Sequence, residues 1–306
     1  MNPTNKFKIK IIAFIQTYSL IAAMTALTSF IAYITAGKLF AVSCIFLILM
    51  IYILTPSATP EALFKFFRAK KINYLDAPVL HKTINYLSKK AGLPAPPELY
   101  YILSEKPAAF ATGTTEKSII AVSSGLLASL TPDELAGVLG HEITHIANND
   151  MRIMWAVVVL NRVTGFLSIL GQVLVFINLP LILLGGMSIN WLLVALLVFA
   201  PTLAFIIQLT LSRVREYSAD RGSAELLGTP DPLISALAKI EYCPRSFWGN
   251  FVYKKQKINT ASLFMTHPPT EERIKRLISL RGRKKVGGKN IFTIHHPKNC
   301  IRLSMF

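Results

Sequence analysis

One short stretch of the chain, His141-Glu142-Ile143-Thr144-His145, has the residue types and spacing of a metal-dependent hydrolytic centre. Two histidines four positions apart lie on the same face of an α-helix, so both imidazoles can reach one ion. Glu142 projects about 100° around the helix from His141, which places its carboxylate beside the ion without binding it. Zinc lowers the pKa of a bound water toward 7, and an adjacent carboxylate can take the proton during attack on a peptide carbonyl. The pattern predicts Glu142 as general base. The alternative is a helix surface with two ordinary exposed histidines.

A catalytic zinc ion needs a third protein ligand and one open position. Asp150 is too close in sequence to His145 to serve, because the helix would have to turn sharply back on itself. Glu216 and Asp220 stand four positions apart and share one helix face, whereas Glu225 lies about half a turn away. One of the pair can bind the ion while the other accepts a hydrogen bond from a ligand imidazole. Spacing leaves open which residue does which, and the alternative is a solvated acidic patch.

The motif needs a helix to display it, and a helix start signal precedes it. Thr131-Pro132-Asp133-Glu134 combines an N-cap threonine, a proline at the first helical position and a glutamate that completes a capping box. The predicted helix runs to about Asn148, so the motif falls in its C-terminal half.

The residues before this helix predict a small α+β unit. A helix begins at Asp76-Ala77-Pro78 and ends at Gly92. Strands are predicted at 98–102 and 118–122. We expect 119–122 to be the edge strand of a zincin-like sheet, to which an extended peptide would add through main-chain hydrogen bonds. The alternative is an ordinary internal strand.

The composition indicates a membrane protein. The chain is 52% hydrophobic and 16% charged, whereas soluble domains average about 25% charged residues. Residues 11–37, 39–54 and 163–211 contain no charged side chain. Because a helix needs roughly 20 apolar residues to cross the bilayer, we predict four transmembrane helices at about 11–37, 39–55, 153–177 and 190–211.

These spans divide the chain into four segments. We predict an N-terminal transmembrane hairpin (1–56), a cytoplasmic segment with the edge strand and the histidine helix (57–152), a second hairpin (153–211), and a cytoplasmic segment with the third ligand and a basic tail (212–306). Lys and Arg flank the spans on one side, which places both termini in the cytoplasm. The net charge of +17 predicts contact with anionic lipid. No motif supports nucleic-acid binding.

Four stretches together resemble a known family: HEITHIANNDM (141–151), SRVREYSAD (212–220), AFATG (109–113) and THPPTEERI (266–274). They are similar to the HtpX-type membrane zinc metalloproteases of the wider Ste24-type peptidases. The resemblance implies one zinc ion per subunit, held by His141, His145 and Glu216, with Asp220 as a supporting hydrogen-bond acceptor. It also implies cleavage of misfolded or damaged membrane proteins at the bacterial inner membrane. One departure is Ala108, where the family usually has asparagine.

The sequence therefore predicts a mostly α-helical, polytopic membrane protein with a cytoplasmic zincin-like α+β catalytic domain, acting as a zinc endopeptidase on polypeptide substrates. His267 is a further candidate, as a donor to the oxyanion of the tetrahedral intermediate, or else as a residue that fixes the start of the last helix. Two other functions stay open: a non-catalytic zinc-binding membrane scaffold, and a peptidase for prenylated C-termini.

Overall fold

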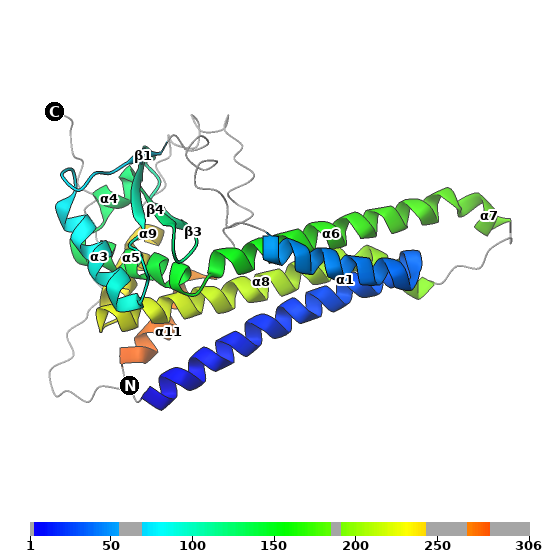
Figure 1. Cartoon of the computed structure of the whole chain (residues 1–306), viewed down its shortest axis with the longest axis horizontal. Coiled ribbons are helices and arrows are strands. Elements are labelled where there is room, and N and C mark those ends of the chain that lie inside the picture. Colours follow the sequence, from blue (N-terminus) through cyan, green and yellow to red (C-terminus); the bar gives the residue numbers. More distant parts are fainter. Residues whose placement is uncertain (1–2, 55–68, 185–190, 243–267, 282–306) are drawn as a thin grey trace.

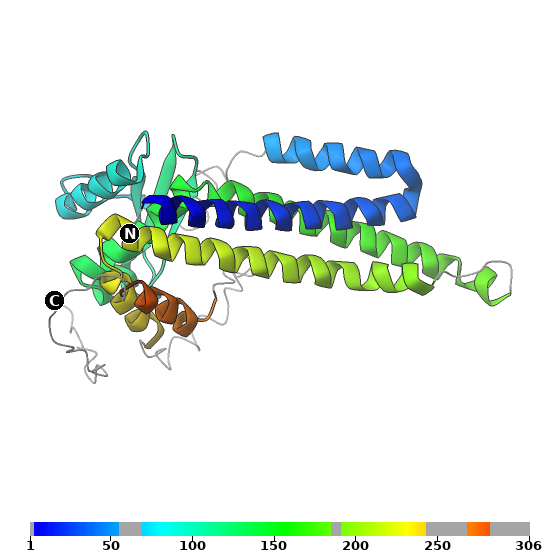
Figure 2. The same cartoon turned by 90° about the horizontal axis from the view of Figure 1, so that it is seen from below.

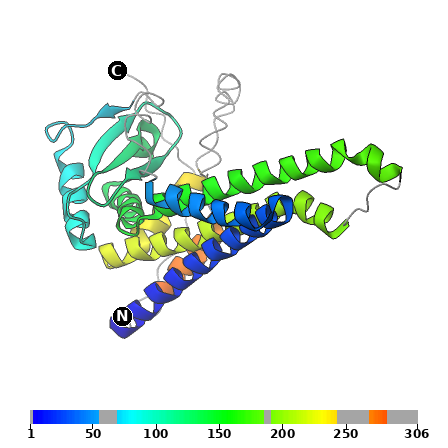
Figure 3. The same ribbon diagram turned by 45° about the vertical axis from the view of Figure 1, so that its right-hand side comes forward.

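The computed structural model describes residues 3–54, 69–184, 191–242 and 268–281 of the chain. Three long helices lie together and project from a part that contains a small sheet and shorter helices (Figure 1). The long helices are α1 (Pro3–Leu54), α6 (Asp150–Ile177) and α8 (Trp191–Leu227). The shorter helices are α3 (Pro78–Ala91), α4 (Ser124–Ser129), α5 (Pro132–Ala147), α7 (Leu179–Leu183), α9 (Asp231–Tyr242) and α11 (Thr270–Arg281). Figure 3 shows the sheet-containing part at one end of the long helices.

The long helices have the length and composition of membrane spans. Within the described residues, Phe14–Ile34, Asp150–Ile177 and Val194–Leu227 are long and apolar enough to cross a membrane. Large apolar side chains on them, such as Phe30, Phe166 and Phe199, are more than half exposed. Such surface is unfavourable in water and suits contact with lipid. The protein is therefore a membrane protein.

The N-terminal helix reverses direction at Gly37, whose φ of 83° is a conformation that glycine adopts without steric cost. Figure 2 shows the second half of α1 doubling back along the first. This second half contains a shorter apolar stretch, Gly37–Met50. Three of the four predicted spans thus have a counterpart among the described residues. The remaining one, the second in chain order at 39–55, stays a prediction.

The sheet has four strands: β1 (Lys70–Lys71), β2 (Glu98–Ile102), β3 (Ala109–Gly113) and β4 (Ser118–Ser123). Their order is β1-β2-β4-β3, with β4 parallel to β2 and antiparallel to β3. The prediction of 119–122 as an edge strand is therefore wrong. Both sides of β4 are hydrogen-bonded to neighbouring strands and its side chains are buried, so no peptide can add to it.

The predicted start of the histidine helix is confirmed. Thr131 and Glu134 form a reciprocal capping box at the start of α5, with Pro132 in the first turn. The predicted helix before the sheet is confirmed as α3, which ends at Gly92 in the left-handed conformation. One apolar core joins α3, the sheet and α5, and Ile143 lies within it with no exposed surface. The motif helix is thus fixed along its buried face.

Close contact between α5 and α8 depends on two glycines. A Cβ on Gly140 would lie 2.9 Å from Oγ of Ser223, and one on Gly222 would lie 2.2 Å from Cγ2 of Thr144. The Ser223 hydroxyl also donates to the carbonyl oxygen of Gly137 at 2.7 Å. Small residues at these positions let the two helices meet, so side chains that are distant in sequence share one site.

Candidate metal centre

Three buried donors converge where α5 meets α8. His141 and His145 come from α5 and Glu216 comes from α8, and their ligand atoms all lie within 4.8 Å of one another. The two Nε2 atoms are 3.0 Å apart. Glu216 Oε2 lies 3.6 Å from His141 Nε2, and Oε1 lies 3.6 Å from His145 Nε2. All three side chains are at most 9% exposed.

The opposite nitrogen of each imidazole faces a carboxylate. His141 Nδ1 lies 3.0 Å from Asp220 Oδ1, and His145 Nδ1 lies 2.6 Å from Asp150 Oδ2. A carboxylate only accepts hydrogen bonds, so each Nδ1 carries the hydrogen and each Nε2 presents a lone pair. Two lone pairs and the Glu216 carboxylate then face one another in a buried space, which is unfavourable without a cation. Ligands of a tetrahedral zinc ion stand roughly 3.4 Å apart, close to the spacings here. The donors fit zinc.

Asp150 contacts His145 because the chain turns sharply after α5, a turn that the sequence spacing did not lead us to expect. Asn149 adopts a left-handed conformation with φ of 55°, and α6 begins at the next residue. The chain therefore does turn sharply between α5 and α6. It brings Asp150 to the outer nitrogen of His145 and not to the shared space between the Nε2 atoms. Asp150 therefore orients the His145 imidazole by a hydrogen bond. The sequence did not predict this role, because Asp150 was considered there only as a metal ligand.

A second residue that the sequence did not identify is Arg273 of α11. It donates to Asp220 from Nε at 2.8 Å and from Nη2 at 2.5 Å, and Nη1 lies 3.3 Å from Glu216 Oε2. Burial alone would lower the pKa of the Arg273 guanidinium, but the hydrogen bond and charge of Asp220 outweigh it and raise that pKa. Arg273 is therefore a permanent buried cation behind the site.

Glu142 is buried on α5 between the two histidines. Its carboxylate is near enough to Arg273 that its charge contributes to the raised pKa of the guanidinium. Ala108 donates its N–H to Oγ of Ser123 at 2.9 Å and precedes β3. His267 lies outside the described residues.

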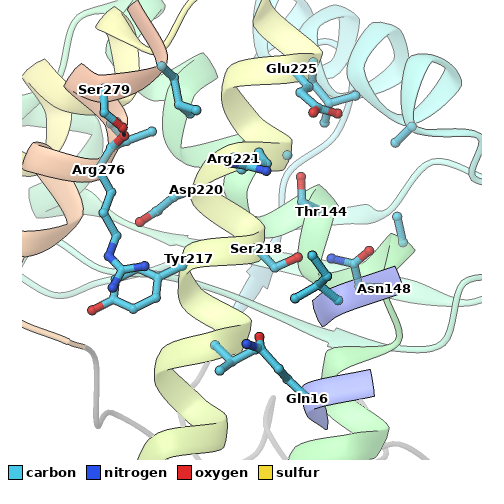
Figure 4. Close-up of a pocket in the computed structure, with 18 of the residues that line it drawn as sticks. Gln16, Thr144, Asn148, Tyr217, Ser218, Asp220, Arg221, Glu225, Arg276 and Ser279 are labelled. Atoms are coloured by element: carbon cyan, nitrogen blue, oxygen red, sulfur yellow. Dashed lines mark hydrogen bonds between the residues drawn. The ribbon is translucent and has the colours of Figure 1, made fainter. Parts of the chain in front are cut away.

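A cavity of about 780 Å³ is lined by residues of several helices, including Asp220 but not His141, His145 or Glu216. Figure 4 shows Asp220 and Tyr217 on one side of α8, and Thr144 and Asn148 on the other. Gln16 of α1 and Arg276 of α11 also line it. Asp220 thus contacts both the cavity and a proposed ligand imidazole.

These features are those of a membrane metalloprotease. The chain has long apolar helices and an α+β part, and a buried group of two histidines and one carboxylate lies next to a glutamate. The sequence pattern of Peptidase family M48 matches residues 75–281, which is more than half of the chain. The protein therefore belongs to peptidase family M48.

Relatives extend the match over nearly the whole chain. A "Protease HtpX homolog" of Persephonella marina is 35% identical over 289 residues, covering 88% of this chain and 98% of that protein. Another, of Thermococcus kodakarensis, is 33% identical over 287 residues, covering 87% and 96%. A solved structure, "Crystal Structure of S. mikatae Ste24p", is 20% identical, with a TM-score of 0.44, and covers 88% of this chain and 66% of that one.

Proposed function

We propose that the protein is a zinc-dependent endopeptidase of the bacterial inner membrane that cleaves misfolded or damaged membrane proteins. The observation that carries this proposal is the convergence of His141 Nε2, His145 Nε2 and the Glu216 carboxylate in a buried space. Family membership and protease relatives support it independently.

His141, His145 and Glu216 would hold the zinc ion. When bound, zinc lowers the pKa of a coordinated water toward 7 and polarises the carbonyl of the scissile bond. Asp220 and Asp150 keep the hydrogen on Nδ1 of each imidazole, so that both Nε2 lone pairs stay available to the ion. The site's own residues thus fix the ligand orientation.

Glu142 is the proposed general base. It accepts a proton from the attacking water and returns it to the amide nitrogen as the peptide bond breaks, so the carboxylate is regenerated in each cycle. Arg273 offsets the negative charge of Asp220 and Glu216, which lets several carboxylates share one buried region.

The active site is proposed to face the cytoplasm. The sheet-containing part lies at one end of α6 and α8 (Figure 1), and the lysines and arginines that flank the predicted spans favour the cytoplasmic side. Basic residues next to the membrane are proposed to contact anionic lipid.

The test is Glu142→Gln in detergent-purified protein, with Glu98→Gln as a control that removes an exposed carboxylate paired with Lys71 in the sheet. We expect Glu142→Gln to bind one zinc ion and to lose casein cleavage by at least about 100-fold. The control should cleave normally, and a chelator should stop all cleavage.

The same assay separates the remaining functions. Zinc binding without cleavage by the wild type would favour the scaffold. Cleavage of a farnesylated peptide but not of casein would favour the peptidase for prenylated C-termini. Normal cleavage by Glu142→Gln would overturn the proposed mechanism.

A further inference from the structure

A series of buried polar contacts leads from a proposed zinc ligand to the N-terminal membrane helix. His145 Nδ1 contacts Asp150 Oδ2 at 2.6 Å. The other oxygen of Asp150 forms an ion pair with Arg215. Arg215 donates from Nη1 to Oγ1 of Thr17, at 3.4 Å. The series joins α5, α6, α8 and α1.

These groups are almost inaccessible to solvent. Asp150 is 1% exposed, Arg215 7% and Thr17 0%. A buried charge is tolerated when an opposite charge pairs with it. Arg215 suits this position because a planar guanidinium presents several donors in fixed directions. It also donates from Nη2 to the carbonyl oxygen of Asn148 at 3.2 Å, which ties down the end of α5.

The series connects the N-terminal membrane helix with the proposed zinc ligands. Thr17 lies in the first membrane-span candidate, Phe14–Ile34. Arg215 directly precedes Glu216, the third proposed ligand. One guanidinium therefore contacts a membrane helix through one nitrogen and holds the carboxylate behind His145 through another.

We propose that Arg215 and Thr17 are positioning residues for the metal centre, so that the seating of α1 determines how His145 is presented to the ion. This inference rests on the proposed zinc site. Without Arg215, the Asp150 carboxylate would be a buried charge lacking its cation, and it would reorient. His145 would then lose the acceptor that fixes its ring. Without the Thr17 hydroxyl, Arg215 would lose its hydrogen bond to α1.

The experiment measures zinc affinity by competition with a chromogenic chelator in detergent. The variants are Thr17→Val, Arg215→Met and Arg215→Lys. The matched control is Thr28→Val. Thr28 is also a fully buried threonine of α1, but its hydroxyl contacts Met24 and Thr164 and not the site. Cobalt-substituted protein gives a second readout, because its visible absorption bands report ligand geometry.

Loss of a group that supports a metal ligand typically weakens binding by about 10–100-fold. We expect Arg215→Met to fall in this range with a changed cobalt spectrum, and Arg215→Lys to recover part of the loss. Thr17→Val should weaken binding by a smaller factor of roughly 3–10. Thr28→Val should match the wild type.

Wild-type zinc affinity and cobalt spectrum in both Thr17→Val and Arg215→Met would overturn the inference and leave the proposed function intact. Equal weakening by Thr17→Val and Thr28→Val would also overturn it, because general loosening of α1 would then be the cause. If Arg215→Met fails to fold, Thr17→Val decides the question alone. A wild type that binds no zinc would instead remove the proposed function itself.

Discussion

Arg273 donates hydrogen bonds from two nitrogens to the Asp220 carboxylate, at 2.8 Å and 2.5 Å, although the two residues lie on different helices and are 53 positions apart. Both side chains are buried. Asp220 in turn contacts His141 Nδ1. The last described helix, α11, therefore completes a site whose other parts come from α5 and α8.

Replacing Arg273 by methionine should destabilise the fold strongly. The change leaves the Asp220 carboxylate buried without its cation, a loss that costs about 3–5 kcal/mol. The control is Arg276→Met one turn further on, where an exposed pair with Glu272 is lost and the expected cost is about 0–1 kcal/mol. Thermal unfolding of both variants in detergent checks the difference. Similar melting temperatures would contradict it.

Asp220→Asn should weaken zinc binding. The amide has the size of the carboxylate but no charge, so it holds the Nδ1 hydrogen of His141 less firmly, and affinity should fall about 10–100-fold. Chelator competition measures this. Asp231→Asn, at the exposed start of α9, is the control and should bind zinc normally. An unchanged affinity in Asp220→Asn would exclude the proposed supporting role.

Gly222→Ala should separate α5 from α8. The new Cβ would lie 2.2 Å from Cγ2 and 2.9 Å from Cβ of Thr144, so the Thr144 side chain or the helix must shift. Such overpacking costs about 1–3 kcal/mol, and the shift should also reduce zinc affinity. Gly165→Ala, where nothing lies within 4 Å, should be neutral or stabilising. Identical unfolding curves for the two variants would argue against close helix contact.

Glu134, the glutamate of the capping box of α5, should make the stability of the fold depend on pH in a specific direction. Burial raises the pKa of the Glu134 carboxyl, but hydrogen bonds from Lys239, Ser235 and the Thr131 N–H outweigh it, and the net pKa is lowered. A carboxyl with a lower pKa in the folded state contributes stability above its unfolded value of about 4.3, and this contribution is lost as pH falls through the folded value.

The comparison is wild type against Glu134→Gln, both stripped of metal. The difference in urea midpoint should be constant near neutral pH and should shrink as pH falls below about 4.3. A difference that grows in acid would have the wrong sign for this mechanism.

Local signals accounted for the parts of the protein that depend on neighbouring residues. Thr131, Pro132 and Glu134 start a helix through contacts within one turn, so the placement of the histidine motif on α5 could be predicted. Apolar length likewise predicted the membrane helices α6 and α8, because hydrophobic burial in a bilayer needs no partner.

Local sequence signals could not predict the order of the strands or the contacts that Asp150 and Arg273 make at the site. Whether 119–122 lies at an edge depends on which strands flank it, and nothing within those residues encodes that. Nothing near Arg273 in the sequence indicates its contact with Asp220, because α11 meets α8 through residues far apart in the chain, among them Arg273 with Asp220, and Leu277 in one apolar cluster with Ala224.

The sequence alone determined the chemistry available: two imidazoles one helical turn apart, a glutamate between them, and two candidate carboxylates on a later helix. The family resemblance gave Glu216 and Asp220 their expected roles, and only the tertiary structure showed which atoms of these groups face one another. Glu216 faces both Nε2 atoms while Asp220 and Asp150 face the Nδ1 atoms. Helix spacing fixes neighbours on one element, whereas the crossing of α5 and α8 and the turn at Asn149 fix which atoms meet.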